Sequence, residues 1–216
     1  MTTPKTIREL LIVGRRRISS GRTAEVVDLV RSNPKKVNQL LECLWDEDPS
    51  VTMRAADALE KLTRNRSSVS DSILESLQDS WKAPLIGLLA EATENKLRWC
   101  LAPVVPRLAL TLPECRRVAE TLHSYLEDSS SIVKTFALQG LADLTRQDLS
   151  LLPEVIDLLQ IHSRSGTPAM RARGRMLLKQ LEPVRARRFI EFESGDSHTG
   201  KLRIRDPLKP LKFPGQ

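Results

Sequence analysis

Residues 51–62 read VTMRAADALEKL, and residues 133–144 read VKTFALQGLADL. Both stretches have apolar residues at their first, ninth and last positions and Ala at the fifth, which makes one apolar stripe along a helix. The small fifth residue lets a neighbouring helix approach closely. LRWCLAPVVPRL at 97–108 and MRARGRMLLKQL at 170–181 follow a similar pattern. The pattern predicts four helices of one kind.

The spacing of these stretches indicates a repeat. They begin 46, 36 and 37 residues apart, which is typical of helical-hairpin repeats. Another helical pattern precedes each of them, at 34–46, 81–92, 113–128 and 149–163. A single hairpin cannot bury its apolar stripe alone, so we expect successive hairpins to stack side by side.

The repeat resembles the HEAT-repeat family, which has HEAT-like and armadillo-like members. The likeness is clearest in DPSVTMRAADALEKL (48–62) and DSSSIVKTFALQGLADL (128–144), and it extends over about 34–182. It implies an all-α fold, a right-handed α-solenoid of stacked helical hairpins whose second helices line a concave face. The 97–108 unit departs from the family pattern, because its two prolines should kink or shorten the helix.

The resemblance also implies a role for basic residues at the start of the second helices. In the family such residues often pair with an Asp between repeats. Arg98, Lys134 and Arg171 occupy the matching positions. We therefore expect these three side chains to form ion pairs within the stack more readily than to bind a ligand.

The ends of the chain have their own patterns. Residues 1–33 predict an N-terminal capping helical hairpin, and 68–80 predict an extra helix inserted between repeats. RFIEFE (188–193) and KLRIRD (201–206) alternate between apolar and polar residues around a turn-rich link. We therefore expect 183–216 to form a C-terminal β-hairpin with an extended, Pro-rich tail.

That C-terminal segment contains the spacing of a phosphate-binding loop. Gly195, Gly200 and Lys201 match it, but Leu202 stands where such a loop has Ser or Thr. The expected strand also replaces the helix whose N-terminus would hold the phosphate. We therefore expect no nucleotide site.

The net charge of +7 is unevenly distributed. Residues 1–36 hold nine Lys or Arg against three acidic residues, and 183–216 hold eight against four, which leaves the middle of the chain net negative. Basic ends can contact nucleic acid, an acidic protein or an anionic membrane surface, or can simply be solvated.

The cysteines and the apolar runs indicate where the protein is located in the cell. Cys43, Cys100 and Cys115 are far apart in apolar helical contexts, so we expect buried, reduced thiols and a cytoplasmic protein. The apolar run near the N-terminus precedes its Arg cluster, which is the wrong order for a secretory signal. No apolar run reaches the ~20 residues that span a bilayer.

No catalytic or metal-binding motif is evident. The three histidines lie in different elements and no known ligand spacing occurs. We therefore expect no enzyme activity, no cofactor and no metal site. Trp45, Trp81 and Trp99 each lie near an expected hairpin turn, where tryptophans usually cover the core rather than stack on bases.

These features favour a non-catalytic scaffold that binds a protein partner through the concave face and the C-terminal appendage. The candidate partner-binding residues are basic residues of the second helices: Arg54, Lys96, Arg98, Arg107, Lys134, Arg171, Arg173 and Arg175. The oligomeric state stays open.

The alternative is nucleic-acid binding through the basic termini. The HEAT-like alkylpurine DNA glycosylases resemble this chain in length and basicity, and they use an Asp near aromatic residues. The chain has only 4% aromatic residues, and the Trp- and Asp-rich signature of those enzymes does not map onto it.

The residue types on the concave face separate protein binding from nucleic-acid binding. Basic residues that converge on the concave face favour nucleic-acid binding, and an apolar patch there favours a protein partner.

Overall fold

A computed structural model of the chain describes residues 6–12, 22–65 and 69–194, with 185–194 described by their backbone. The regular structure in these ranges is helical throughout, and no strand forms there. The all-α class is therefore confirmed for the part of the chain that the structure describes.

The helices alternate between two layers. The first helices of successive pairs are α1 (Ile7–Ile12), α3 (Val37–Glu42), α6 (Lys82–Glu91), α8 (Leu112–Tyr125) and α10 (Leu152–Ser165). The second helices are α2 (Thr23–Ser32), α4 (Pro49–Thr63), α7 (Asn95–Val104), α9 (Ser131–Leu144) and α11 (Pro168–Ser194). One further helix, α5 (Asp71–Asp79), lies between α4 and α6. Short 3-10 turns cover Pro34–Lys36, Cys43–Trp45, Val105–Arg107 and Leu149–Leu151.

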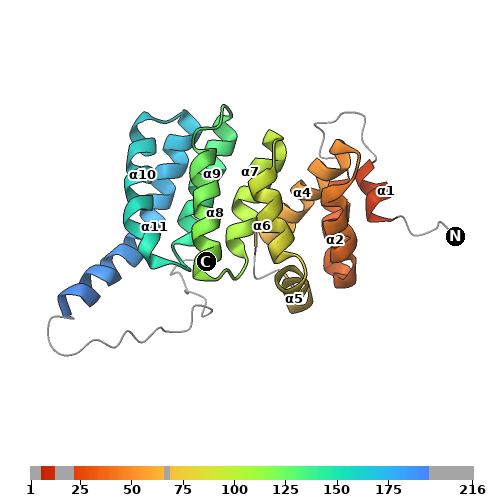
Figure 1. The fold of residues 1–216 in the computed structure, drawn as a ribbon, viewed down its shortest axis with the longest axis horizontal. Coiled ribbons are helices and arrows are strands. Elements are labelled where there is room, and N and C mark those ends of the chain that lie inside the picture. Colours follow the sequence, from red (N-terminus) through yellow and green to blue (C-terminus); the bar gives the residue numbers. More distant parts are fainter. Residues whose placement is uncertain (1–5, 13–21, 66–68, 195–216) are drawn as a thin grey trace.

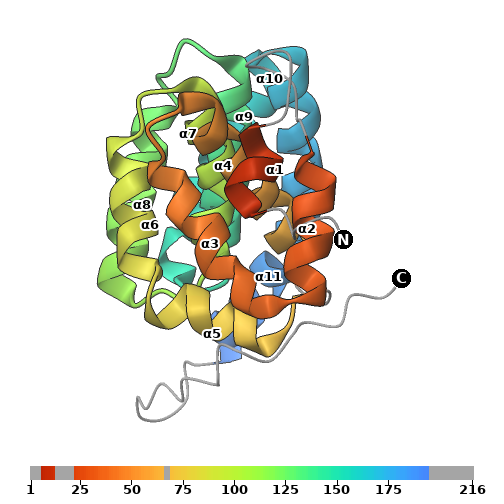
Figure 2. The same ribbon diagram turned by 90° about the vertical axis from the view of Figure 1, so that its right-hand side faces the viewer.

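The second helices pack against one another in chain order, α2 on α4, α4 on α7, α7 on α9 and α9 on α11. The first helices form the other layer, in which α5 bridges α3 and α6, and α6 packs on α8. The pairs follow each other along the long axis of the molecule (Figure 1), and in the view along that axis α6 and α8 lie on the opposite side from α2 and α11 (Figure 2). Each pair is thus covered by its neighbours in the sequence.

The apolar stripes predicted from the sequence make the core. In α4 the four stripe positions, Val51, Ala55, Leu59 and Leu62, are fully buried. The same positions are buried in 97–108, where the last two lie just beyond the end of α7, and in α9, and in α11 only Leu178 stays half-buried. Since the stripe faces both the preceding helix and the neighbouring pairs, it is shared between repeats rather than enclosed within one.

Close approach of α7 and α9 depends on a glycine. A Cβ on Gly140 would clash with the carbonyl oxygen of Ala102 and would stand 2.8 Å from Cδ1 of Leu122. Pro103 lies in the last turn of α7, and the chain tightens into a 3-10 turn directly after Val104. The expected shortening of this helix by proline is therefore confirmed.

The C-terminal β-hairpin is not supported. RFIEFE (188–193), expected as its first strand, lies within α11, which continues past Pro183 to Ser194. Residues 184–194 contain Arg, Ala and Glu, which are good helix formers, and a six-residue alternation is too short to outweigh them. The second strand, the tail and the phosphate-loop spacing fall in 195–216, outside the described residues. The expected insertion helix, by contrast, is present as α5.

The three cysteines are buried and form no disulfide. Burial raises the pKa of the Cys43 and Cys115 thiols to about 11, so they stay protonated at neutral pH. Over the described ranges, the search for a helix long and apolar enough to cross a membrane finds none.

Candidate functional site

The second helices expose one side, which we call the second-helix face. On α9 this side carries Ile132, Phe136, Gln139 and Asp143, spaced i, i+4, i+7 and i+11. Ile132 is exposed, and the other three side chains are half-buried. The residues between them point into the core or toward neighbouring helices. The equivalent side of α7 carries Lys96 and Trp99, and that of α11 carries Arg173 and Met176.

Three side chains form a continuous row across this face, which we call the aromatic row. The rings of Trp99 and Phe136 stack with their centroids 5.4 Å apart and their planes 28° apart. The guanidinium carbon of Arg173 lies 5.8 Å from the Phe136 ring centroid. Because residues early in α7, α9 and α11 meet one another, the three helices run parallel and in register.

Two exposed apolar side chains border the row. Ile132 lies one turn before Phe136 and is 52% exposed, and Met176 lies almost one turn after Arg173 and is 40% exposed. Large apolar side chains with this much exposure on one face, next to partly exposed rings, are characteristic of a contact surface for another molecule.

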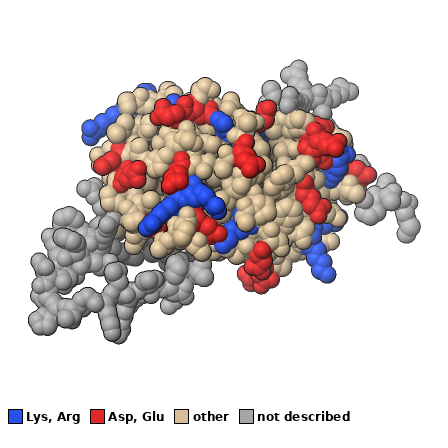
Figure 3. Space-filling view, viewed as in Figure 1, with Lys and Arg blue, Asp and Glu red and all other residues tan. Residues whose placement is uncertain are grey.

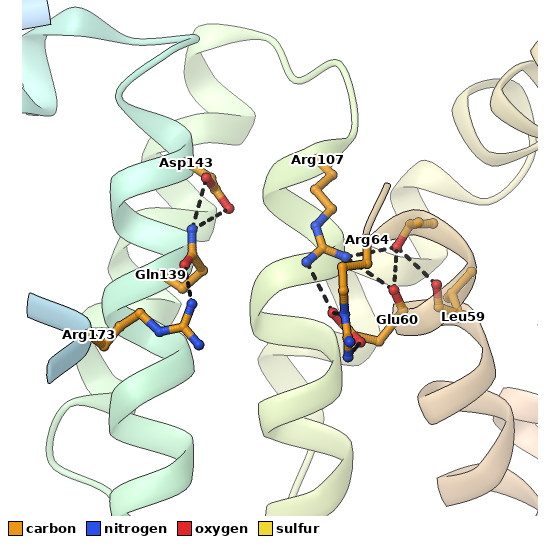
Figure 4. Close-up of polar contacts among 8 residues, drawn as sticks. Leu59, Glu60, Arg64, Arg107, Gln139, Asp143 and Arg173 are labelled. Atoms are coloured by element: carbon orange, nitrogen blue, oxygen red, sulfur yellow. Dashed lines mark hydrogen bonds and ion pairs between the residues drawn. The ribbon is translucent and has the colours of Figure 1, made fainter. Parts of the chain in front are cut away.

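A polar cluster occupies the other half of the face, where α4 and α7 end (Figure 4). Glu60 is only 2% exposed. Its carboxylate accepts hydrogen bonds from Arg64 at 2.6 Å and from Arg107 at 3.1 Å, and Arg107 also donates to the Thr63 hydroxyl at 3.1 Å. Burial works to raise the pKa of Glu60, but these two guanidinium groups together outweigh it and hold the pKa below its usual value.

Asp143 is the second carboxylate of this region (Figure 4). The amide nitrogen of Gln139 donates to both of its oxygens at 3.1 Å, and the Gln139 oxygen accepts from Arg173 at 2.9 Å. Burial raises the pKa of Asp143 in spite of the surrounding positive charges. Glu60 is thus stabilised as an anion by two guanidinium groups that donate to it, whereas the side chain that donates to Asp143 is the neutral amide of Gln139.

Two of the predicted binding residues are used inside the stack instead. Arg54 is 1% exposed and donates to the carbonyl oxygens of Leu11 and Ile12 at 2.6 and 3.3 Å, at the end of α1. Arg98 donates to Asp128, in the link before α9, at 2.5 Å. Arg98 therefore forms the inter-repeat pair that the resemblance implied, and neither side chain reaches the face.

Arg98 is held by further contacts in its own helix pair and in the next one. Its Nε donates to the Ala92 carbonyl oxygen at 2.7 Å, and its guanidinium lies 5.2 Å from the Tyr125 ring centroid. Arg8 and Asp46 repeat the arrangement near the N-terminus, with a 2.6 Å contact between a guanidinium and the Asp of a linker. Asp46 and Asp128 each also accept from the backbone N–H two residues on.

The other predicted residues divide between the face and its surroundings. Lys96, Arg107 and Arg173 lie on the second-helix face. Arg171 donates to the Gly166 carbonyl oxygen at 2.9 Å within its own helix pair. Lys134 is half-buried and is in no ion pair among the described residues, so the pairing expected for it and for Arg171 is not observed.

Arg175 is exposed on the side of α11 that also carries Leu178 and Glu182, by helical spacing. That side borders a shallow groove against Ile156 and Gln160 of α10, away from the aromatic row. The structure therefore brings together only three of the eight predicted residues.

Sequence reasoning missed most of the site. Phe136, Ile132, Met176 and Asp143 were not identified, and Trp99 was expected to cover the core. The signal was available in 131–144, where the side opposite the buried stripe carries two large apolar residues instead of charges. Trp45 and Trp81 pack on each other with ring centroids 5.7 Å apart, and Trp45 is 47% exposed.

Other classes of site receive little support. Within the described ranges, no group of three or more His, Cys, Asp or Glu side chains could hold a metal ion. On the side of the molecule that shows α6 and α8, charges of both signs are interspersed and form no continuous basic patch (Figure 3). The Arg clusters at 15–17 and 185–188 lie where side chains are not described.

Comparison with known proteins identifies a similar fold but no family. No protein-family model matches the chain, and no curated protein matches it. Among solved structures, the crystal structure of an engineered protein from a structural genomics consortium is similar, with a TM-score of 0.57 and 17% sequence identity. The match covers 82% of this chain and 78% of that one. At this identity the likeness concerns the fold alone.

Proposed function

We propose that this chain is a short, right-handed α-solenoid of the HEAT-like class and a non-catalytic scaffold that binds a protein partner through its second-helix face. Two layers of helices, in which each pair contacts its sequence neighbours, support the solenoid. A face of this kind offers a long surface and needs no catalytic group.

The observation that carries the proposal is the aromatic row with its exposed apolar borders. Trp99 and Phe136 are partly exposed on the face, Arg173 lies over a ring, and Ile132 and Met176 are largely uncovered. Aromatic residues, Met and Arg are the side chains enriched where proteins bind one another. An apolar face was the feature expected to favour a protein partner over nucleic acid.

The arrangement of the arginines weighs against nucleic-acid binding by the described part of the chain. Arg54, Arg98 and Arg107 each donate to oxygen atoms of the protein itself. A phosphate-binding groove needs such cations free to neutralise the ligand. Asp143 lies two turns from Phe136 on the same face, but a carboxylate and a ring without an enclosing pocket do not make a glycosylase site.

Site-specific photo-crosslinking tests the proposal. A photoreactive amino acid replaces Met176 on the face or, as the control, Ile161, which is 56% exposed on α10. We expect a discrete protein adduct from position 176 in the cells that make the protein, and none from 161. Equal labelling from both positions would mean that the face is not the binding surface.

A titration with labelled single- and double-stranded DNA and RNA addresses the alternative. Phosphate contacts give binding that falls steeply with salt. Micromolar binding at physiological salt that is lost when Arg15, Arg16 and Arg17 are replaced by Ala would establish the nucleic-acid function instead.

A further inference from the structure

The N-terminal parts of the last three second helices contain no carboxylate. Residues 95–104, 131–142 and 168–181 hold neither Asp nor Glu, although acidic residues make up 27 of the 216 in the chain. These three segments supply the whole aromatic row and its borders. The acidic side chains of the face, Glu60 and Asp143, lie in its other half, where α4 and α9 end.

Two cations of this region are in no ion pair among the described residues, although Arg173 lies close enough to Asp143 to oppose the burial that raises the pKa of that carboxyl. Arg173 contacts one neutral acceptor, the Gln139 side-chain oxygen, and the Phe136 ring, and it is in no ion pair among the described residues. Its guanidinium has five N–H donors in a fork that matches a carboxylate. Lys96, one turn before Trp99, is likewise in no described ion pair. The N-terminal ends of α7, α9 and α11 carry partial positive charge, which also favours an anionic ligand.

We propose that the aromatic row is the docking site for an acidic peptide segment of a partner protein. A carboxylate of the segment pairs with Arg173, and an adjacent large apolar side chain packs between Ile132 and Met176 against the rings. This inference rests on the proposed function and adds the chemistry of the partner: negative charge next to apolar bulk.

The ring geometry favours a peptide over a nucleic acid. Trp99 reaches Phe136 from α7, and Arg173 reaches it from α11, on the opposite side of α9. A base that stacked on Phe136 would have to share the ring with both of these neighbours. A carboxylate needs only the free edge of the Arg173 guanidinium.

Selection from a displayed library of random 12-residue peptides against the full chain tests the inference. We expect the enriched peptides to share Asp or Glu next to a large apolar residue. For the best peptide, the Arg173→Gln variant should weaken binding about tenfold or more, because a charge-assisted hydrogen bond is lost. Circular dichroism melts establish that the variant is folded.

A pair of opposite charges at one exposed position gives an independent measurement. Met176→Lys should bind the same peptide more tightly than Met176→Glu, because both variants lose the apolar contact of Met176 and differ only in the sign of the new charge. Both variants alter a side chain that is 40% exposed, so folding is not at issue. Ile161→Glu, on α10, is the control and should leave the affinity unchanged.

Three outcomes would overturn the inference. They are enrichment of peptides without acidic residues, no enrichment at all, and equal affinities for Met176→Lys and Met176→Glu. A protein adduct from position 176 together with any of these would leave the scaffold function standing and remove only the acidic partner. Equal crosslinking from 161 and 176 would remove the scaffold function itself. RNA or DNA that competes with the peptide at physiological salt would assign the row to nucleic acid.

Discussion

Arg54 illustrates how one side chain can be structural where the sequence pattern suggested a ligand contact. It is 1% exposed, and its guanidinium donates to the last carbonyl groups of α1. These carbonyls have no partner within their own helix. A buried guanidinium that satisfies them fixes the N-terminal helix pair to α4.

Replacing Arg54 by Met should therefore lower the free energy of unfolding by about 2–4 kcal/mol, because buried carbonyls lose their donor. Urea denaturation followed by circular dichroism measures this. Arg175→Met is the matched control, since Arg175 is exposed on α11, and it should change the free energy by less than about 0.5 kcal/mol. Similar midpoints for the two variants would contradict the structural role.

Asp143 should make a contribution to stability that depends on pH. Burial raises the pKa of its carboxyl in the folded state, so its ionised form is disfavoured there. Stability linked to a raised pKa is present below the unfolded pKa of about 3.9 and is lost as the pH rises through the folded pKa. Asn at this position stays neutral and keeps an acceptor for Gln139.

We therefore expect Asp143→Asn to melt at a higher temperature than the wild type at pH 7. The difference should shrink as the pH falls and vanish below about pH 3.9, where both side chains are neutral. Thermal melts from pH 3 to pH 8 measure it. Asp157→Asn, on the exposed side of α10, is the surface control measured alongside it. A lower melting temperature for Asp143→Asn at pH 7 would contradict the burial argument.

At the scale of the element, the sequence predicted the helices best where an apolar stripe was long. The stripes of α4, α7, α9 and α11 are buried as expected, and the shortening of α7 at its prolines followed from proline chemistry. The predicted strand at 188–193 was wrong because six alternating residues fit a helix equally well.

The candidate site was harder to predict than the helices. A helix pattern shows which side is buried, but it does not show which neighbours reach the other side. Trp99 contacts Phe136, 37 positions away, only because α7 and α9 lie in register. Arg98 and Lys134 occupy matching positions in the repeat, yet only Arg98 meets a linker Asp. Such contacts depend on the exact placement of each pair, which spacing alone does not determine.

The packing of α7 on α9 can be tested with two glycines that have opposite surroundings. Gly140→Ala should destabilise the protein by about 1–3 kcal/mol, since its Cβ would meet Leu122 and the Ala102 carbonyl. Gly87→Ala, in α6, has nothing within 4 Å of the new Cβ. It should stabilise the protein by about 0.5–1 kcal/mol through helix propensity. Urea midpoints of both variants decide this, and stabilisation by both would show that helix propensity, not close packing, governs position 140.

At the scale of the whole molecule, the stack makes stability a property of neighbouring pairs. Helices α7 and α9 have second helices packed on both sides, whereas α1 and α2 are covered from one direction, by α3 and α4, among the described elements. Contacts between pairs such as Arg98 with Asp128 join only adjacent units. In the solenoid that we propose, a helix pair with a neighbour on one side can open without the rest.

Hydrogen exchange followed by mass spectrometry should therefore show a gradient, with amides of α7 and α9 exchanging most slowly and those of α1 and α2 much faster. Arg54→Met should accelerate exchange in α1 and α2 and leave α9 nearly unchanged, because the Arg54 guanidinium donates to the carbonyl oxygens of Leu11 and Ile12 in the N-terminal unit. Gly140→Ala is the converse variant and should accelerate α7 and α9 as well. Equal acceleration of every helix by Arg54→Met would mean that the chain unfolds as a single cooperative unit, and the stack would then not behave as a row of separable pairs.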